Sequence, residues 1–324
     1  MLTPEEHEQL GSWIRAAYGD RSAAIIGSAT RTTGLLLRIQ LQSMTMWLRA
    51  GGVIERSLAD TEREGLVANE LGAAGVPLTA AIPRANGCLA GLLPFRETNL
   101  PAIGYLELGG VEVQEPSSAQ AQTLGISLRR LHGSKVSASA QDLPAVEPSR
   151  NIDTRLSEAR KWLTAGQARD LTSIVEQALE RVQTASLPLT VCHGDLRYAN
   201  VRFDGARPTL FDLEALGLGP AEYDLACLWR RRVIESGMVD VPKDWLWFCR
   251  GYERQDPLNV GSWSLIPPLA CLRAFWTMTL PIEPRAAWGR VYRESPEYWH
   301  AHMAQMAWFG NAMLSGHPSC TERT

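Results

Sequence analysis

Lysine is scarce in this chain of 324 residues: there are three, and none precedes residue 135. The other 29 basic residues are arginines, and 35 acidic residues leave a formal net charge of −3. A chain without positive excess has no general attraction to nucleic acid, so we expect no nucleic-acid partner. Where a site in the first 134 residues needs a basic side chain of the lysine or arginine type, that side chain must therefore be an arginine.

Paired cysteines and membrane-spanning segments are also lacking. The six cysteines lie far apart with no Cys-x-x-Cys pair, which argues against a disulfide framework or a zinc site. The first residues are acidic and do not resemble a signal peptide. The most apolar long stretch, 264–282, contains Arg273 and three prolines, so we expect no membrane span. We therefore expect a cytoplasmic protein with no membrane partner.

The first hundred residues combine strand-like and helical patterns. Apolar runs at 23–26, 34–41 and 44–49 predict a three-stranded antiparallel meander, with a small polar loop over 27–33. Apolar positions at helical spacing predict a helix over 60–74 that begins at Asp60 as N-cap. Further strand-like segments follow.

The remainder is mainly helical. Helices are expected over 116–132 and over 153–183, the second broken near Gly166. Residues 96–115 read as irregular, so we predict an N-terminal domain of residues 1–98 and a C-terminal domain of residues 99–324. The final third holds eight of the eleven tryptophans.

The segment 187–214 carries the clearest chemical pattern. An apolar run delivers His193-Gly194-Asp195 to a loop, and Asn200 follows five residues after Asp195. A hairpin around Asp204-Gly205 comes next, and its second strand ends at Asp212. Carboxylates at strand ends are common metal ligands at the mouth of a cleft.

The spacing of His193, Asp195 and Asn200 resembles that of the corresponding residues in the catalytic loop of protein kinases. With Gly194 inside the motif and Tyr223-Asp224 soon after it, the chain is most similar to the aminoglycoside phosphotransferases and related small-molecule kinases. The resemblance implies an α+β, protein-kinase-like, two-lobed fold. Its small N-terminal lobe would hold an antiparallel sheet and one helix, and its larger C-terminal lobe would be mainly helical and bind the acceptor.

The same resemblance implies roles for residues of this segment. Asp195 would orient and deprotonate the substrate hydroxyl, while Asn200 and Asp212 would hold Mg²⁺ against the phosphates of ATP or GTP. The supporting residues would be His193 beneath the loop, Glu214 near the metal and Asp224, which would begin the next helix and steady the loop backbone.

The N-terminal lobe of the family uses a strand lysine paired with a helix glutamate, and this chain has no lysine there. Arg49 is the expected replacement, with Glu64 as its partner fifteen residues on, and Arg38 is the rival. The loop 27–33, which includes Ser28, would cover the phosphates. The segment 92–95 would lead to the hinge that grips the base, which makes Leu93 and Phe95 nucleotide-binding candidates.

The acceptor is expected to be a hydroxylated small molecule, an antibiotic or a metabolite, because Asp224 comes only twelve positions after Asp212 and this leaves no long activation segment for a peptide. Residues 251–324 carry six arginines and six acidic residues, which is not the acidic surface that a polycationic aminoglycoside favours. Several tryptophans of the C-terminal part could line the acceptor site or belong to the core: Trp245, Trp247, Trp263, Trp276, Trp288 and Trp299.

Two alternatives stay open. A nucleotide-binding pseudokinase would fit the missing lysine and the glycine-poor loop. A metal-dependent hydrolase could use His193, Asp195 and Asp212, but it needs more histidine ligands than the other histidines of the chain are placed to supply.

Overall fold

A computed structural model describes residues 2–31, 34–52, 56–135, 137–146, 151–238, 243–254, 263–282, 292 and 294–315. The chain forms two compact units. Unit 1 comprises Met1–Glu112, Ser134–Pro144 and Asn200–Leu216, and unit 2 comprises Val113–Gly133, Ala145–Ala199 and Gly217–Thr324. The expected division falls at residue 98, whereas unit 1 continues to Glu112 and takes in two later segments of the chain.

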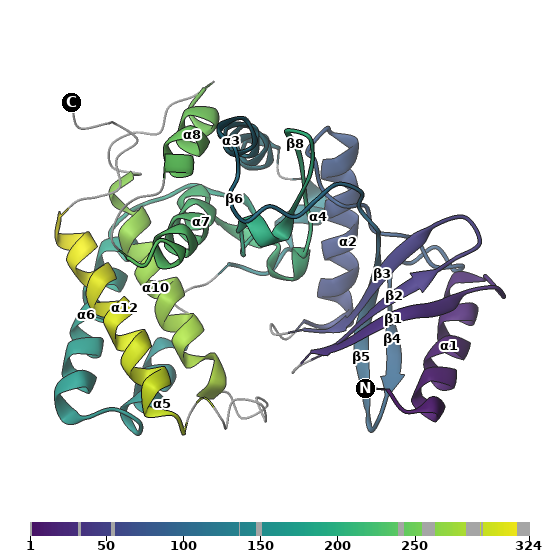
Figure 1. The fold of residues 1–324 in the computed structure, drawn as a ribbon, viewed down its shortest axis with the longest axis horizontal. Coiled ribbons are helices and arrows are strands. Elements are labelled where there is room, and N and C mark those ends of the chain that lie inside the picture. The colour runs from purple at the N-terminus through teal and green to yellow at the C-terminus, as the bar shows by residue number, and fades with distance from the viewer. Residues whose placement is uncertain are drawn as a thin grey trace. The chain divides into compact units, whose positions relative to one another are not determined.

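Unit 1 is built on a five-stranded antiparallel sheet in the order β1-β2-β3-β5-β4 (Figure 1). Its elements are α1 (Pro4–Tyr18), β1 (Ala24–Arg31), β2 (Gly34–Gln40), β3 (Thr45–Gly51), α2 (Leu58–Ala73), β4 (Ala90–Phe95), β5 (Thr98–Leu106), α4 (Ala138–Gln141), β7 (Val201–Asp204), β8 (Arg207–Leu210) and η2 (Leu213–Ala215). The short 3-10 helix η1 (Tyr198–Asn200) contains the point at which the chain passes from unit 2 to unit 1. Strand alternation sends Leu35, Leu37 and Ile39 to one face, where they pack with Leu10 and Ile14 of α1. Helix α2 covers the other face (Figure 1).

The expected meander is confirmed as β1, β2 and β3. Three element predictions are wrong. Residues 27–31 continue strand β1 instead of forming a loop, because each of them pairs with β2. Residues 98–106, expected to be irregular, form β5 between β3 and β4. Helix α2 begins earlier than expected, since Ser57 is its N-cap and Asp60 completes the capping box.

The hairpin of β7 and β8 belongs to unit 1 although it lies far along the chain. Its strands pair from Val201 with Leu210 to Asp204 with Arg207. Isolated bridges join Leu210 to Leu78 and Phe203 to Val111. These contacts fix the hairpin against the part of unit 1 that follows α2.

Unit 2 is mainly helical. Its elements are α3 (Ser118–Gly133), α5 (Ile152–Arg160), α6 (Ala165–Gln183), β6 (Leu189–Cys192), β9 (Gly217–Pro220), α7 (Ala221–Glu235), α8 (Lys243–Tyr252), α10 (Ile266–Thr279), η3 (Leu280–Ile282) and α12 (Pro296–Ser315). The predicted helix 153–183 is broken, as expected, just before Gly166. Large aromatic side chains fill the core, among them Trp229, Trp245, Phe248, Phe275 and Phe309.

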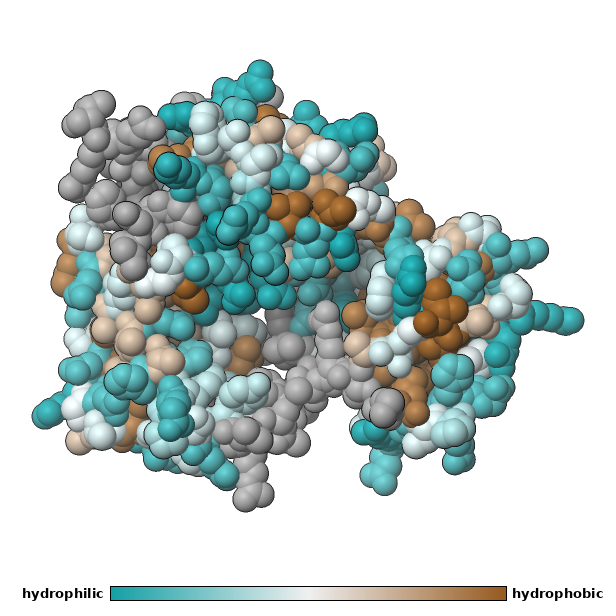
Figure 2. Space-filling model, viewed as in Figure 1, coloured by the Kyte–Doolittle hydropathy of each residue, from teal (hydrophilic) through white to brown (hydrophobic). Residues whose placement is uncertain are grey.

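Hydrophilic residues predominate on the face shown in Figure 2, with smaller apolar patches among them. Two large apolar side chains exposed on unit 1 are Ile26 and Leu92. Within the described ranges, no helix combines the length and the apolar character needed to cross a bilayer.

Candidate active site

The loop that carries Asp195 is set by a short two-stranded ladder in unit 2. Strand β6 pairs with β9 from Leu189 with Pro220 to Cys192 with Gly217, and the loop begins directly after β6. Gly194 has a φ of +82°, a backbone conformation that side chains other than glycine disfavour. This turn leaves His193 fully buried and the Asp195 side chain 31% exposed.

Asp224, in the first turn of α7, holds this loop by its backbone. Its two carboxylate oxygens accept hydrogen bonds from the N–H groups of His193, at 2.7 Å, and Gly194, at 2.8 Å. Asp224 is itself fully buried. Because charge-assisted hydrogen bonds to a buried carboxylate are strong, the position of the Asp195 backbone is closely defined.

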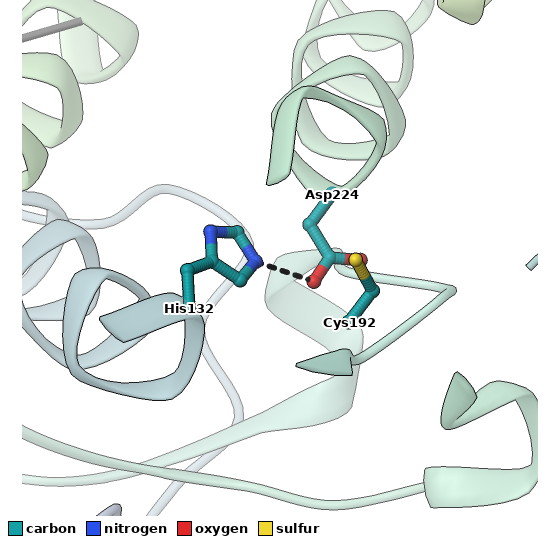
Figure 3. Close-up of side chains that lie close together, drawn as sticks. All are labelled: His132, Cys192 and Asp224. Carbon is teal, nitrogen blue, oxygen red and sulfur yellow. Dashed lines mark hydrogen bonds and ion pairs between the residues drawn. The ribbon is translucent and has the colours of Figure 1, made fainter. Parts of the chain in front are cut away.

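Asp224 also belongs to a buried cluster with His132 and Cys192 (Figure 3). His132 Nε2 lies 3.0 Å from Asp224 Oδ2, and His132 Nδ1 lies 2.7 Å from the Tyr252 hydroxyl. His132, Cys192 and Asp224 form the one group of His, Cys, Asp and Glu side chains in the described ranges whose ligand atoms lie close enough together for a metal ion. The chemistry does not fit one: burial raises the pKa of the Cys192 thiol well above its usual range, and both Asp224 oxygens already accept hydrogen bonds.

The carboxylate of Asp195 is surrounded by guanidinium groups. Arg273 Nη2, from α10, donates to Asp195 Oδ1 at 2.7 Å, and Arg197 Nε lies 3.5 Å from Oδ2. Burial acts to raise the pKa of Asp195, but the charges of Arg273 and Arg197 outweigh it and hold the pKa below the usual range. Asp195 is therefore ionised at neutral pH.

In unit 1, the hairpin places Asn200 and Asp212 at the same end of its two strands. Asn200 directly precedes β7 and Asp212 follows β8, and the Phe211 N–H donates to the Asn200 carbonyl at 3.0 Å. Asp212 has a φ of +60°, in the left-handed region that few non-glycine residues adopt and that aspartate adopts more readily than most. Asn200 is buried, and Asp212 is half-buried.

The segment that follows Asp212 is hydrogen-bonded to Arg56, which lies just before α2. Arg56 donates from Nε to the Glu214 carbonyl at 3.1 Å and from Nη2 to the Leu216 carbonyl at 3.0 Å. The Glu214 side chain is buried, and its carboxylate approaches Gly52, where an added Cβ would lie 2.9 Å from it. The chain just after β3 therefore lies against the carboxylate of Glu214.

The expected Arg49–Glu64 pair is present between β3 and α2. Arg49 Nη2 donates to both Glu64 oxygens, at 2.5 and 2.7 Å, and Glu64 is 2% exposed. The Tyr105 hydroxyl, from β5, donates to Glu64 Oε1 at 2.6 Å. Burial acts to lower the pKa of Arg49, but the charge of Glu64 outweighs it, so Arg49 stays protonated.

The other candidates of unit 1 lie elsewhere. Arg38 donates to Glu107 from Nε at 2.7 Å and from Nη2 at 2.8 Å, so it is not the partner of Glu64. Ser28 is exposed on strand β1. Leu93 and Phe95 are buried in the core of unit 1. The segment 92–95 lies in β4, which turns directly into β5. Its role in binding the base stays a prediction.

The comparisons with known proteins agree with this geometry. The model of the phosphotransferase enzyme family matches residues 47–258, which include Arg49 in β3, the Asp195 loop and the hairpin. The chain belongs to this family. A relative in Deinococcus radiodurans, an uncharacterized protein, is 29% identical over 242 residues, which cover 72% of this chain and 70% of that protein.

Solved structures of this phosphotransferase fold are also similar over nearly the whole chain. An amicoumacin kinase, in complex with AMP-PNP, Ca²⁺ and amicoumacin, has a TM-score of 0.71 at 14% identity, covering 97% of this chain and 94% of its own. A spectinomycin phosphotransferase with ADP and spectinomycin has a TM-score of 0.69 at 15% identity, covering 96% and 99%. A microcompartment-associated aminopropanol kinase reaches 0.71 at 15%, covering 96% and 98%. The phosphotransferase chain therefore has the expected kinase-like α+β fold.

Sequence reasoning missed three residues of this phosphotransferase: Tyr105, His132 and Arg273. The partner of each lies at least 41 residues away in the sequence, at Glu64, Asp224 and Asp195 respectively. One signal was available for Arg273, because an arginine inside the most apolar long stretch of the chain needs a buried partner.

The tryptophans of the phosphotransferase divide between core and surface. Trp245 and Trp299 are buried in unit 2. Trp263 and Trp276 are half-buried, and Trp247 is 38% exposed. Trp288 lies outside the described residues. Of those described, Trp276 is the one in contact with a partner of Asp195, since Arg273 lies 4.3 Å from its ring centroid.

Proposed function

We propose that the protein transfers the γ-phosphoryl group of a nucleoside triphosphate to a hydroxyl of a small molecule, with Asp195 as the base. The observation that carries the proposal is the state of Asp195: partly exposed, ionised, and held by a loop whose backbone is hydrogen-bonded to Asp224. An ionised carboxylate with about four lone-pair sites can accept the substrate hydroxyl while it keeps both arginine contacts.

The residues proposed as metal ligands have suitable chemistry. Asn200 and Asp212 offer an amide and a carboxylate oxygen from one end of the hairpin, and Mg²⁺ prefers oxygen ligands. A bound Mg²⁺ would supply charge neutralisation at the phosphates. Glu214, buried on the same segment, would support this end of the site.

Arg49 is proposed to bind the nucleotide phosphates in place of the expected lysine. Its Nη2 is held by Glu64, and its Nη1 makes a long contact of 3.4 Å with the Gly51 carbonyl, so N–H donors remain for phosphate oxygens. The pairing of Glu64 with both Arg49 and Tyr105 keeps the guanidinium in one orientation. ATP or GTP would be the donor.

A small acceptor is favoured by the short connection from Asp212 to Asp224, which has no room for a peptide-binding activation segment. The similar structures named above include kinases of amicoumacin, spectinomycin and aminopropanol. An antibiotic or a hydroxylated metabolite is therefore proposed as the class of acceptor.

The test is release of ADP or GDP with a panel of hydroxylated compounds, with Mg²⁺ or with EDTA. We expect Mg²⁺-dependent turnover that falls by about 10²-fold or more in Asp195→Ala. The matched control is Asp204→Ala, an exposed aspartate at the hairpin turn, which should keep wild-type turnover. Nucleotide binding without turnover across the panel would favour the pseudokinase, whose support is Arg49 in place of lysine. Zn²⁺-dependent hydrolysis would favour the hydrolase.

A further inference from the structure

Positive charge exceeds negative charge around Asp195 in unit 2. Tyr223, Cys227 and Arg230 follow one another at helical spacing on α7, on the side that packs against α10 with Arg273. Arg273 donates from Nη1 to the Tyr223 hydroxyl at 3.3 Å and from Nη2 to Asp195 at 2.7 Å. Asp195 is among the charges that act on both Arg230 of α7 and Arg273 of α10.

The other acidic groups beside Arg273 are neutral. Burial raises the pKa of Tyr223 far above its usual range and the pKa of Cys227 to about 12. Of the three acidic side chains that act on Arg273, Asp195 alone is ionised at neutral pH. Asp195 already forms ion pairs with Arg273 and Arg197. Among the described residues, no further carboxylate forms an ion pair with Arg230.

Arg230 is the cation that this excess of positive charge leaves without a carboxylate of its own among the described residues. Its Nε atom is buried and has no hydrogen-bond partner among the described residues. Burial, and next the charge of Arg273, lower the pKa of Arg230 to about 10. Arg230 as a whole is half-buried. A cation that is partly removed from water and has no paired charge is costly, so this position is suited to an anion that the protein does not itself provide.

Trp276 provides an aromatic surface beside Arg273. It lies one turn after Arg273 on α10 and is half-buried, with the guanidinium of Arg273 4.3 Å and that of Arg155 5.8 Å from its ring centroid. Arg155 also donates to Thr279 Oγ1 at 2.9 Å. Cations over an aromatic ring beside a half-exposed carboxylate fit a ligand that has an anionic group and a short carbon chain.

We propose that Arg230 and Arg273, beside Trp276, bind a carboxylate or phosphate of the acceptor whose hydroxyl Asp195 orients. The acceptor would then be a hydroxylated anion and not a polycation. This inference rests on the proposed function for the role of Asp195. The charge excess and the unpartnered Arg230 Nε do not depend on that function.

The probes are four compounds with one three-carbon skeleton that differ in charge: glycerate, glycerol 3-phosphate, glycerol and 3-amino-1,2-propanediol. Binding to the full-length protein is measured by calorimetry with AMP-PNP and Mg²⁺ present, and ADP release is measured separately with ATP. We expect an anionic member to bind at least about tenfold more tightly than glycerol, because a charge-assisted hydrogen bond is gained. Comparing glycerate with glycerol 3-phosphate distinguishes a carboxylate from a phosphate acceptor.

The variants are Arg230→Gln, Arg230→Lys and, as the matched control, Arg231→Gln on the exposed side of α7, where Arg231 pairs with Glu235. We expect Arg230→Gln to remove the anion preference, and Arg230→Lys and Arg231→Gln to keep it. Arg230→Lys preserves the charge, so it separates loss of binding from loss of folding. Equal binding of all four probes, a preference for the amine, or an anion preference unchanged in Arg230→Gln would overturn the inference.

The two proposals fail in different ways. Anion binding that depends on Arg230, without ADP release from any probe, supports the anion site and counts against the proposed phosphoryl transfer. ADP release with glycerol or the amine that is insensitive to Arg230→Gln overturns the anion site and supports the transfer. An effect of Arg230→Gln on AMP-PNP affinity alone would assign the anion to the nucleotide and also overturn the inference.

Discussion

At the scale of single residues, the properties of Asp195 come from its neighbours. Burial alone would raise the pKa of a carboxylate, but the charges of Arg273 and Arg197 outweigh burial, lower the pKa and keep Asp195 ionised. The same contacts orient the carboxylate, so that a hydroxyl bound to it meets a base that is already charged and positioned.

The lowered pKa of Asp195 predicts how acid changes stability. Because the folded pKa lies below the unfolded value of about 3.9, the stabilisation by Asp195 is complete above that value and is lost as the pH falls through the folded pKa. The difference in free energy of unfolding between wild type and Asp195→Asn should stay constant from pH 7 to pH 5 and shrink below about pH 4. Urea unfolding at each pH measures it. A difference that already shrinks between pH 7 and pH 5 would show that the pKa is not lowered.

The hydroxyl of Tyr105 predicts a second residue-scale effect. Tyr105→Phe removes the hydrogen bond to the buried Glu64 and should lower the free energy of unfolding by about 1–2 kcal/mol. It should also raise the KM for the nucleotide, because Glu64 orients Arg49. The matched control is Tyr18→Phe, since the Tyr18 hydroxyl is buried without a hydrogen-bond partner in the described ranges and its loss should cost nothing. Equal destabilisation by both substitutions would contradict the role of Tyr105.

At the scale of elements, the close packing of α3 and α8 depends on two glycines. A Cβ at Gly251 would lie 2.0 Å from the Gln122 carbonyl oxygen, and a Cβ at Gly125 would lie 2.1 Å from that of Phe248. These neighbours are backbone atoms, which cannot turn away as a side chain can. The approach of the two helices places Tyr252 at the end of α8 beside His132 at the end of α3.

Gly251→Ala should therefore destabilise the protein by about 3 kcal/mol or more, because the helices must separate. Gly72→Ala, at an exposed position of α2 with nothing within 4 Å, should be neutral or stabilise by up to about 1 kcal/mol. Thermal or urea unfolding of both variants measures the difference. A Gly251→Ala variant as stable as wild type would disprove this account of the α3–α8 packing.

At the scale of the whole molecule, each unit is assembled from separate stretches of chain. Unit 1 takes three segments, and the last of them carries the proposed metal ligands on a hairpin that bridges to Leu78 and Val111. The residues proposed to bind phosphates and metal in unit 1 therefore share one packed body although they lie about 150 residues apart in sequence.

Binding of a nucleotide with its metal should stabilise the whole protein. AMP-PNP with Mg²⁺ at about 100 times its dissociation constant would add about 2.7 kcal/mol, which appears as a higher Tm. The increase in Tm should be smaller when EDTA replaces Mg²⁺, and the difference between the two conditions should disappear in Asp212→Asn. Asp204→Asn, in the exposed hairpin turn, should retain it. A Tm increase that is the same with Mg²⁺ and with EDTA in the wild type would count against a metal at Asn200 and Asp212.

The amino-acid sequence alone determined local features: the meander, the mainly helical character of the later chain, and the hairpin between Asn200 and Asp212. These follow from alternation, turn residues and spacing, which act within a few residues. The Arg49–Glu64 pair was expected from the resemblance to the kinase family, and the structure forms it between the neighbouring elements β3 and α2. Tertiary structure decided the insertion of β5 between β3 and β4, and the surroundings of each charge. Arg273 meets Asp195 across 78 residues, and Tyr105 meets Glu64 across 41. Such contacts depend on how buried faces pack together, and no short-range pattern in the chain encodes them.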